Sequence, residues 1–453
     1  MVNQLDDNRE FKDSPLGMIP KDWDVKFLGD CAFITKLAGF EYTNYFNNYS
    51  QTGEIIALRV LNLRNGKLEL TNIQTIPKST SKKLPRSALH KNDLVISYVG
   101  TIGEVALIEE DDRFHLAPNV AKISPNQQII LSKFLFIQIL SETTQKKLIY
   151  LSTTTSQPAL SMSRLRQLPI ILPPFSEQKQ IAKILDTVNK AIAQTETLIA
   201  KYKRVKTGLM QDLLTRGIDE HGQLRDPRTH KFKRSPLGMI PDEWDVVTLS
   251  NEIDIVHGHG FKGEYFSDQP PGTILLVPGN FYREGGIYFD NRNTKFYQGL
   301  IPEWTILNNG DILIVMTDLS PQTLILGRVI QIDLPFKVLH NQRIGKIIIK
   351  LPETWNNRFL MAVMNSTRVR NGIINNATGT TVKHTSPERI IANIVPKPCI
   401  REQKQILTIL DKQEELISSE QTNLTKLQKI KTGLMQDLLT GKTSVKPLLT
   451  NQP

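Results

Sequence analysis

The sequence is poor in the residues that build disulfide frameworks and metal centres. Its 453 residues include two cysteines and eight histidines. Two cysteines are too few for a disulfide framework, and lone loop histidines are usually solvated, so we predict no metal site. No segment approaches the roughly 20 apolar residues of a membrane span, and the N-terminus lacks the basic and apolar regions of a signal peptide. We therefore expect a cytoplasmic protein.

The motifs of common enzymes are also missing. The glycines of Gly258–Gly263 match a dinucleotide fingerprint, but Pro270 and Pro271 follow where a helix is required. The LPPF of Leu172–Phe175 is similar to the tetrapeptide of amino-methyltransferases, yet leucine stands where Asn or Asp binds the target amino group. The Glu177 and Lys179 pair lies in the expected first turn of a helix, where capping explains it better than nuclease chemistry. We predict no catalytic residues.

Internal repetition is the strongest positive signal. The segment KTGLMQDLLT occurs unchanged at Lys206–Thr215 and Lys431–Thr440, and SPLGMIP occurs at Ser14–Pro20 and Ser235–Pro241. Each copy of a repeat is a structural unit. By contrast, Ile34 to Gly66 shares little with its counterpart, residues 256–286. Such a chain suits a protein that needs one scaffold twice and a different recognition surface on each copy.

The charge balance points to a class of partner. The formal net charge is +11 and the pI is about 9.4. A basic surface commonly matches phosphate backbones, although some basic proteins bind acidic proteins or membranes. Nucleic acid is the favoured partner.

Strand-like runs fill the first part of each copy, and helical periodicity fills the last part. The fold class expected is α+β, with two mixed α/β domains, two long antiparallel helices forming a coiled coil, and pseudo-two-fold symmetry. The expected segments are an N-terminal scaffold (1–22), a first variable domain (23–174), a central long helix (175–215), a linker with a second scaffold segment (216–243), a second variable domain (244–398), a distal long helix (399–440) and a flexible tail (441–453).

Both long helices carry a heptad stripe, which predicts a helical partner. The first seam position repeats at residues 181, 188, 195, 202 and 209, and again at 406, 413, 420, 427 and 434. We place the second seam position three residues later, at 184, 191, 198 and 205, and at 409, 416, 423 and 430. Packing of each stripe against its own domain is the alternative. In an antiparallel pair, Asn423 and Thr197 would meet and fix the register.

The ordered set of scaffold segments resembles the specificity (S) subunit of type I restriction-modification systems. The segments that carry the resemblance are SPLGMIP-x-x-W-x-V, the proline-rich exits before EQKQI, KTGLMQDLLT, and the linker at Thr215–Lys233. The resemblance implies a non-catalytic subunit that binds double-stranded DNA and two methyltransferase (M) subunits, with two restriction (R) subunits in a larger complex.

In this family, each variable insert is a target-recognition domain that reads one half of a bipartite site. Because the inserts differ, the site should be asymmetric. S-adenosylmethionine, ATP and Mg are expected on the partner subunits, and no cofactor is expected on this chain. A self-contained DNA methyltransferase or nuclease and a coiled-coil scaffold protein are the alternatives.

Polar and basic loops are the candidates for DNA contacts, because phosphates attract Lys and Arg, whereas Arg, Asn and Gln read bases. In the first copy they are Arg59, Asn62, Arg64, Lys82, Lys83, Arg86, Thr154, Thr155, Ser156 and Gln157. In the second copy they are Asn280, Tyr282, Arg283, Thr380, Thr381, Lys383 and His384. For each residue, a solvated surface side chain is the alternative.

Overall fold

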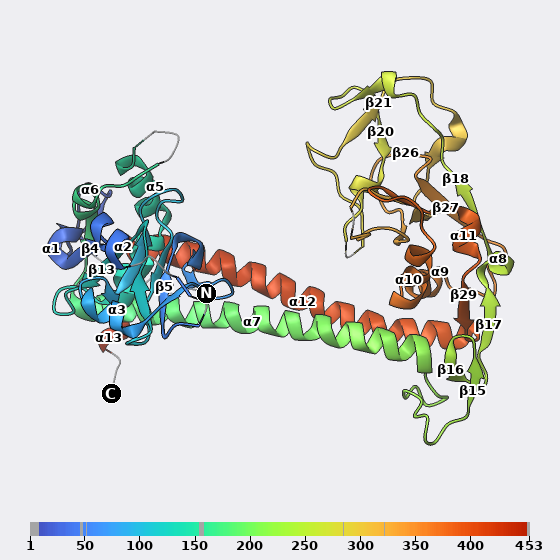
Figure 1. Cartoon of the computed structure of the whole chain (residues 1–453), viewed down its shortest axis with the longest axis horizontal. Helices are drawn as coiled ribbons and strands as arrows, with labels where there is room; N and C mark the ends of the chain where they lie inside the picture. Colours follow the sequence, from blue (N-terminus) through green and yellow to red (C-terminus); the bar gives the residue numbers. More distant parts are fainter. Residues whose placement is uncertain are drawn as a thin grey trace. The chain divides into compact units, whose positions relative to one another are not determined.

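The computed structural model describes residues 9–45, 49–50, 52–153, 158–283, 285–320 and 322–450. The chain forms two compact units, the first from Met1–Thr197 with Gln421–Pro453 and the second from Leu198–Glu420. The boundary falls within two long helices, α7 (Phe175–Arg216) and α12 (Ile400–Leu439) (Figure 1). Each unit therefore contains one variable domain and one half of each long helix.

Two four-stranded sheets form the variable domain of the first unit. One is antiparallel and has the order β11-β10-β13-β4. The other has the order β8-β5-β12-β9 and contains one parallel pair, β5 with β12. The strands are β4 (Ala32–Lys36), β5 (Ile55–Leu58), β8 (Thr75–Ile76), β9 (Ala88–Leu89), β10 (Leu94–Ser97), β11 (Val105–Leu107), β12 (Phe114–Leu116) and β13 (Val120–Pro125). Their aliphatic side chains are largely buried.

The second unit repeats this topology. Its antiparallel sheet has the order β18-β27-β23-β25, and its mixed sheet has the order β19-β21-β20-β26-β22, with β20 parallel to β26. The strands are β18 (Ile253–His257), β19 (Phe266–Ser267), β20 (Thr273–Leu276), β21 (Lys295–Tyr297), β22 (Ile306–Leu307), β23 (Ile312–Val315), β25 (Val329–Gln331), β26 (Val338–His340) and β27 (Ile344–Ile349). The variable inserts thus share a fold although their sequences have diverged.

Two short helices follow the strands of each variable domain. They are α4 (Ser132–Leu140) and α5 (Glu142–Leu151) in the first, and α9 (Asn357–Met364) and α10 (Thr367–Asn375) in the second. Ser141 and Ser366 separate the helices of each pair, because each side chain accepts a backbone hydrogen bond at the start of the second helix.

The scaffold segments close each unit in the same way. In the first unit β3 (Asp24–Phe27) pairs with β14 (Pro169–Leu172), and in the second β17 (Asp245–Thr248) pairs with β29 (Ile394–Lys397). The hairpins of β1 (Phe11–Lys12) with β2 (Ile19–Pro20) and of β15 (Phe232–Ser235) with β16 (Gly238–Pro241) precede them. A tryptophan, Trp23 or Trp244, is buried beside each hairpin.

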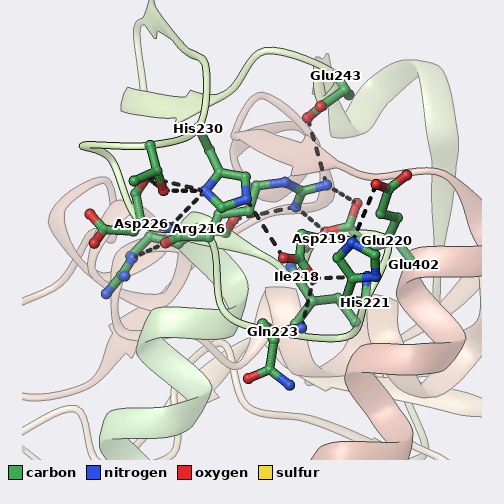
Figure 2. Close-up of polar contacts among 12 residues, drawn as sticks. Arg216, Ile218, Asp219, Glu220, His221, Gln223, Asp226, His230, Glu243 and Glu402 are labelled. Atoms are coloured by element: carbon green, nitrogen blue, oxygen red, sulfur yellow. Dashed lines mark hydrogen bonds and ion pairs between the residues drawn. The ribbon is translucent and has the colours of Figure 1, made fainter.

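A buried ion-pair network holds the linker onto the start of α12. Arg225 donates to Glu402, and Glu402 also accepts a hydrogen bond from the Trp244 indole (3.0 Å). Figure 2 shows Glu402 beside Ile218, whose amide donates to the same carboxylate at 2.9 Å. In the first unit the matching residue is Glu177, whose carboxylate accepts a hydrogen bond of 2.7 Å from Arg9. These two glutamates bind the scaffold rather than cap their helices.

The C-terminal tail is partly ordered, in contrast to the expected flexible segment 441–453. Val445 is buried in the core of the first unit, and Lys446 pairs with Asp22 at 2.7 Å. A short helix, α13 (Pro447–Thr450), follows. Scaffold contacts therefore extend to Lys446, seven residues beyond the end of α12.

The two long helices run antiparallel in each unit. In the first unit Ile181 and Leu185 of α7 share a core with Leu438 of α12, and in the second unit Leu213 shares a core with Ile406 and Leu410. Lys206 of α7 also pairs with Glu414 of α12. The expectation of paired antiparallel helices is confirmed.

The second position of the helical seam lies one residue later than expected. The partly or fully buried residues are 185, 192, 199, 206 and 213 on α7, and 410, 417, 424, 431 and 438 on α12. At the positions we expected, Val205 and Leu416 are 46% exposed. The expected polar centre is also wrong, since Thr197 and Asn423 are both exposed and the Thr197 hydroxyl bonds Ala193 of its own helix.

Candidate nucleic-acid interface

A buried asparagine organises one β-hairpin in each variable domain. Asn62 ends a 3-10 turn, η1 (Val60–Asn62), and Asn280 ends the matching turn, η3 (Pro278–Asn280). Both asparagines are fully buried. Asn62 Oδ1 accepts from the Arg59 amide at 3.1 Å, and Asn280 Oδ1 accepts from the Val277 amide at 2.8 Å. Each side chain therefore fixes the turn that leads into its hairpin.

The amide nitrogens of the same asparagines hold the far side of the hairpin. Asn62 Nδ2 donates to the carbonyls of Glu69 and Asn72, both at 2.9 Å. Asn280 Nδ2 donates to the carbonyls of Tyr288 at 3.4 Å and Asn293 at 3.1 Å. Because these side chains are buried and occupied, neither asparagine reads a base, which corrects the expectation for Asn62 and Asn280.

A hollow of about 720 Å³ lies beside the first hairpin. Its walls carry Arg59 and Arg64 from the hairpin segment, Tyr42 and Tyr49 from the segment before β5, and Glu104 from the loop before β11. Burial raises the pKa of Tyr49 to about 12, with Tyr42 adding to the rise, so its phenol is neutral at physiological pH. The first hollow therefore combines arginine cations with neutral aromatic hydroxyls.

A second hollow of about 800 Å³ lies beside the second hairpin. Its walls include Tyr282 and Tyr288, whose rings stack with centroids 4.3 Å apart, together with Arg283 and Asp318. The Asp318 carboxylate accepts from the amides of Ile325 (2.7 Å) and Leu326 (3.1 Å), which shapes the opposite wall. The second hollow is thus more aromatic and more acidic than the first.

Arg370 supports the wall that contains Leu324 and Ile325. Its guanidinium donates to the carbonyls of Leu324 at 3.0 Å and Leu326 at 3.1 Å. Burial lowers the pKa of Arg370 to about 10, which still leaves the side chain charged at neutral pH. Hydrogen bonds from a largely buried arginine therefore hold this wall in place.

The polar loop before α11 (Pro387–Ile391) lies beside the strand that borders the second hollow. Its strand β28 (Lys383–His384) pairs with β24 (Thr317–Asp318), and His384 Nδ1 lies 3.0 Å from Thr317 Oγ1. Thr380 and Thr381 are exposed at the loop tip. The structure brings these four predicted residues into one loop next to Asp318. The matching candidates Thr154, Thr155, Ser156 and Gln157 lie outside the described residues.

The basic candidates of the first domain cluster around α3 (Lys78–Lys83). Lys82 and Lys83 are exposed, and Lys83 Nζ lies 5.9 Å from the centroid of the Tyr45 ring. Arg86 is exposed as well, with Glu41 at 4.0 Å. These long, solvated cations suit phosphate contacts better than base reading.

The sequence did not single out several residues that the fold brings to the hollows. Tyr42, Glu104 and Asn119 belong to the first hollow, and Tyr288 and Asp318 belong to the second. They come from separate strands and loops, so no local spacing links them.

The two repeated segments also line one groove in each unit. The first groove has a volume of about 430 Å³ and the second about 440 Å³. Their shared walls consist of matching residues, namely Thr432, Met435, Gln436, Leu439, Thr440 and Leu16 in the first groove, and Thr207, Met210, Gln211, Leu214, Thr215 and Leu237 in the second. Within the described ranges, the scaffold thus presents the same groove twice.

Two further structural findings bear on chemistry and location. In the part of the chain that the structure describes, no group of three or more His, Cys, Asp or Glu side chains could hold a metal ion. Among the helices of that same part, none is both long and apolar enough to cross a membrane. Cys31 is buried and Cys399 is exposed, and both are free thiols.

Comparisons with known proteins agree with this arrangement. The family model of the type I restriction modification DNA specificity domain matches residues 20–204. The type I restriction enzyme MjaVIII specificity subunit of Methanocaldococcus jannaschii is 26% identical over 456 residues, which cover 99% of both chains. A protein of the same organism, named as the MjaX specificity subunit, is 26% identical over 455 residues, covering 96% of this chain and 97% of the other.

The fold is also similar to that of a solved chain. That chain comes from a study of complex assembly and conformational transition in a type I R-M system. The TM-score is 0.61 at 15% identity, and the match covers 94% of this chain and 99% of that chain. Over nearly its whole length the chain is thus similar to specificity subunits of type I restriction-modification systems, and residues 20–204 match the DNA specificity domain of these systems.

Proposed function

We propose that this chain is the non-catalytic DNA-reading subunit of a type I restriction-modification complex. Each variable domain reads one half of a bipartite, asymmetric DNA site. The observation that carries this proposal is the pair of matching hairpins, each fixed by a buried asparagine, whose exposed residues differ between the copies. A constant fold with variable exposed side chains suits two readers of different sequences.

The long helices would set the distance between the two half-sites. The segments EQKQI and KTGLMQDLLT keep the same separation in both copies, so the helices have gained no net insertion. Length changes instead fall in the variable domains. This pattern supports a role for α7 and α12 as a fixed spacer.

The two matching grooves would bind two copies of one partner, a methyltransferase subunit. Gly208 and Gly433 stand beside the grooves, within the long helices, where glycine costs about 1 kcal/mol relative to alanine. A Cβ atom at either position would meet no other heavy atom within 4 Å. Since packing within the chain does not require these glycines, close approach of a partner explains why both copies contain one.

The catalytic equipment would then reside on the partners. S-adenosylmethionine would bind the methyltransferase subunits, and ATP and Mg would bind the two restriction subunits of a larger complex. The assembly would work in the cytoplasm, where its DNA substrate is found.

Co-expression with the neighbouring methyltransferase tests the proposal. Methylation mapped across a genome should reveal a split target with two different halves. Exchange of residues 23–174 for another variable domain should change one half only. A continuous target, or stoichiometric S-adenosylmethionine binding by this chain alone, would contradict the proposed function.

A further inference from the structure

The two hairpins can be aligned residue by residue through their buried asparagines. The Asn62 carbonyl accepts from the Glu69 amide at 2.8 Å, and the Asn280 carbonyl accepts from the Tyr288 amide at 2.9 Å. The next residues, Leu63 and Phe281, are buried in both copies. The second residue after the asparagine is therefore the same structural position, and it is occupied by Arg64 in one domain and Tyr282 in the other.

A side chain from the opposite wall holds each hairpin tip. Glu104 Oε2 accepts a hydrogen bond of 2.9 Å from the Asn65 amide. Arg328, which precedes β25 as Glu104 precedes β11, donates to the carbonyl of Arg283. The two residues have opposite charges, yet both hold the backbone next to the aligned position. This tether limits the motion of Arg64 and Tyr282 relative to their hollows.

Both aligned side chains are accessible. Arg64 is exposed on the wall of the first hollow, and the structure gives it no hydrogen bond or ion pair among the described residues. Arg59, its neighbour in the hollow, instead donates to the carbonyl (2.9 Å) and side chain (3.1 Å) of Asn72. Tyr282 is 48% exposed and stacks on Tyr288. Arg64 thus has all its donors available for a ligand, whereas Arg59 is partly occupied.

We infer that this aligned position selects a base in each half-site, with Arg64 selecting guanine. The inference rests on the proposed function. A free arginine fork matches the O6 and N7 acceptors of guanine in the major groove, and this bidentate pair discriminates against other bases by a factor of roughly 5 to 150. Tyr282 has no such fork. Its ring, fixed by Tyr288, provides apolar contact of the kind that favours the thymine methyl group.

The test uses the full chain in complex with its methyltransferase partner and a library of randomised target sequences. Wild-type protein should require guanine at one position of the half-site read by the first domain. Arg64→Tyr should reduce that preference at least fivefold and leave the other half-site unchanged. Tyr282→Arg should create a guanine preference in the half-site read by the second domain.

Two controls separate base reading from general effects. Arg64→Lys keeps the positive charge but lacks the planar fork, so a base reader loses guanine preference while a phosphate contact keeps it. Arg113→Tyr changes an exposed arginine of the same unit that does not line the hollow, and selectivity should be unchanged. Thermal unfolding confirms that each variant is folded.

The outcomes distinguish this inference from the proposed function. An unchanged first half-site in Arg64→Tyr, or retained guanine preference in Arg64→Lys, overturns the assignment of Arg64 even if the wild-type target is split. A wild-type complex with no split target instead overturns the proposed function.

Discussion

Arg225 donates from both terminal nitrogens to the Glu402 carboxylate, at 2.5 and 3.2 Å, and both side chains are less than 10% exposed. The linker and α12 are far apart in sequence, so this ion pair holds two distant segments of the chain together. In the first unit, by contrast, Arg9 donates to Glu177 through one nitrogen, and Glu177 Oε1 has no hydrogen-bond partner among the residues that the structure describes. The Arg225–Glu402 pair of the second unit therefore contains more hydrogen bonds than the Arg9–Glu177 pair of the first.

Glu402→Ala should destabilise the second unit by about 3–5 kcal/mol, because it removes the carboxylate that accepts from Arg225, Ile218 and Trp244 and leaves the buried Arg225 only the more distant Glu243, at 3.6 Å. Glu177→Ala should cost less, since Glu177 accepts a single hydrogen bond from Arg9. Hydrogen exchange of the full chain, followed near Trp244 and Trp23, measures both effects. Equal loss of protection in the two variants would contradict the inequality.

Asn62→Asp should destabilise the first hairpin by about 1–3 kcal/mol. The substitution preserves the size of the side chain but removes the amide donors to Glu69 and Asn72, and it buries a negative charge facing those carbonyls. Urea unfolding measures the change. The matched variant Asn280→Asp should destabilise the second hairpin alone. Asn375→Asp, on an exposed helix end, should have little effect on stability.

Stability should decrease as the pH falls below about 6.5. His115 lies on β12 and His340 on the matching strand β26, one register position apart, and burial lowers the pKa of each below its ordinary value. Between that ordinary pKa and the lowered one, the unfolded chain binds protons that the folded chain excludes, which favours unfolding. Each histidine should contribute up to about 1.4 kcal/mol per pH unit in this range.

Urea unfolding at pH 7.5 and pH 5.5 checks the histidine prediction. The double substitution His115→Gln and His340→Gln should reduce the difference between the two pH values. His221→Gln removes an exposed histidine and should leave the difference unchanged. A wild-type chain with equal stability at both pH values would rule the effect out.

Gly208→Leu should block partner docking at the second groove without destabilising the chain. Leucine favours the helix over glycine by about 0.5–1 kcal/mol, and the added side chain points into open space. If wild-type protein binds two methyltransferase subunits, Gly208→Leu and Gly433→Leu should each bind one, and the double variant none. Calorimetric stoichiometry measures this, with Thr425→Leu as the control at an exposed helix position outside the repeated segments.

Sequence reasoning identified the long helices well and their packing less well. The repeat at 181, 188 and 195 correctly marks one seam position, because heptad spacing is a local property. The choice between Ile184 and Leu185 for the second position was wrong, since both are aliphatic and the spacing allows either. Only the position of the partner helix decides between them.

The candidate site was less predictable than the scaffold. Four of the predicted DNA contacts line the two hollows, namely Arg59 and Arg64 in the first and Tyr282 and Arg283 in the second. Their contact with DNA stays a prediction. Asn62 was a reasonable base reader from its residue type, but its side chain is occupied by three hydrogen bonds, to Arg59, Glu69 and Asn72. Such contacts depend on chain closure over several residues and leave no local pattern in the sequence.

The tethers from Glu104 and Arg328 have a consequence for how this protein can evolve. Both hold main-chain atoms, which every amino acid supplies, and neither depends on the side chain at position 64 or 282. Substitutions at those positions should therefore leave the hairpin intact. A lineage could acquire a new DNA target by point mutation while its partner subunits continue to bind unchanged helices.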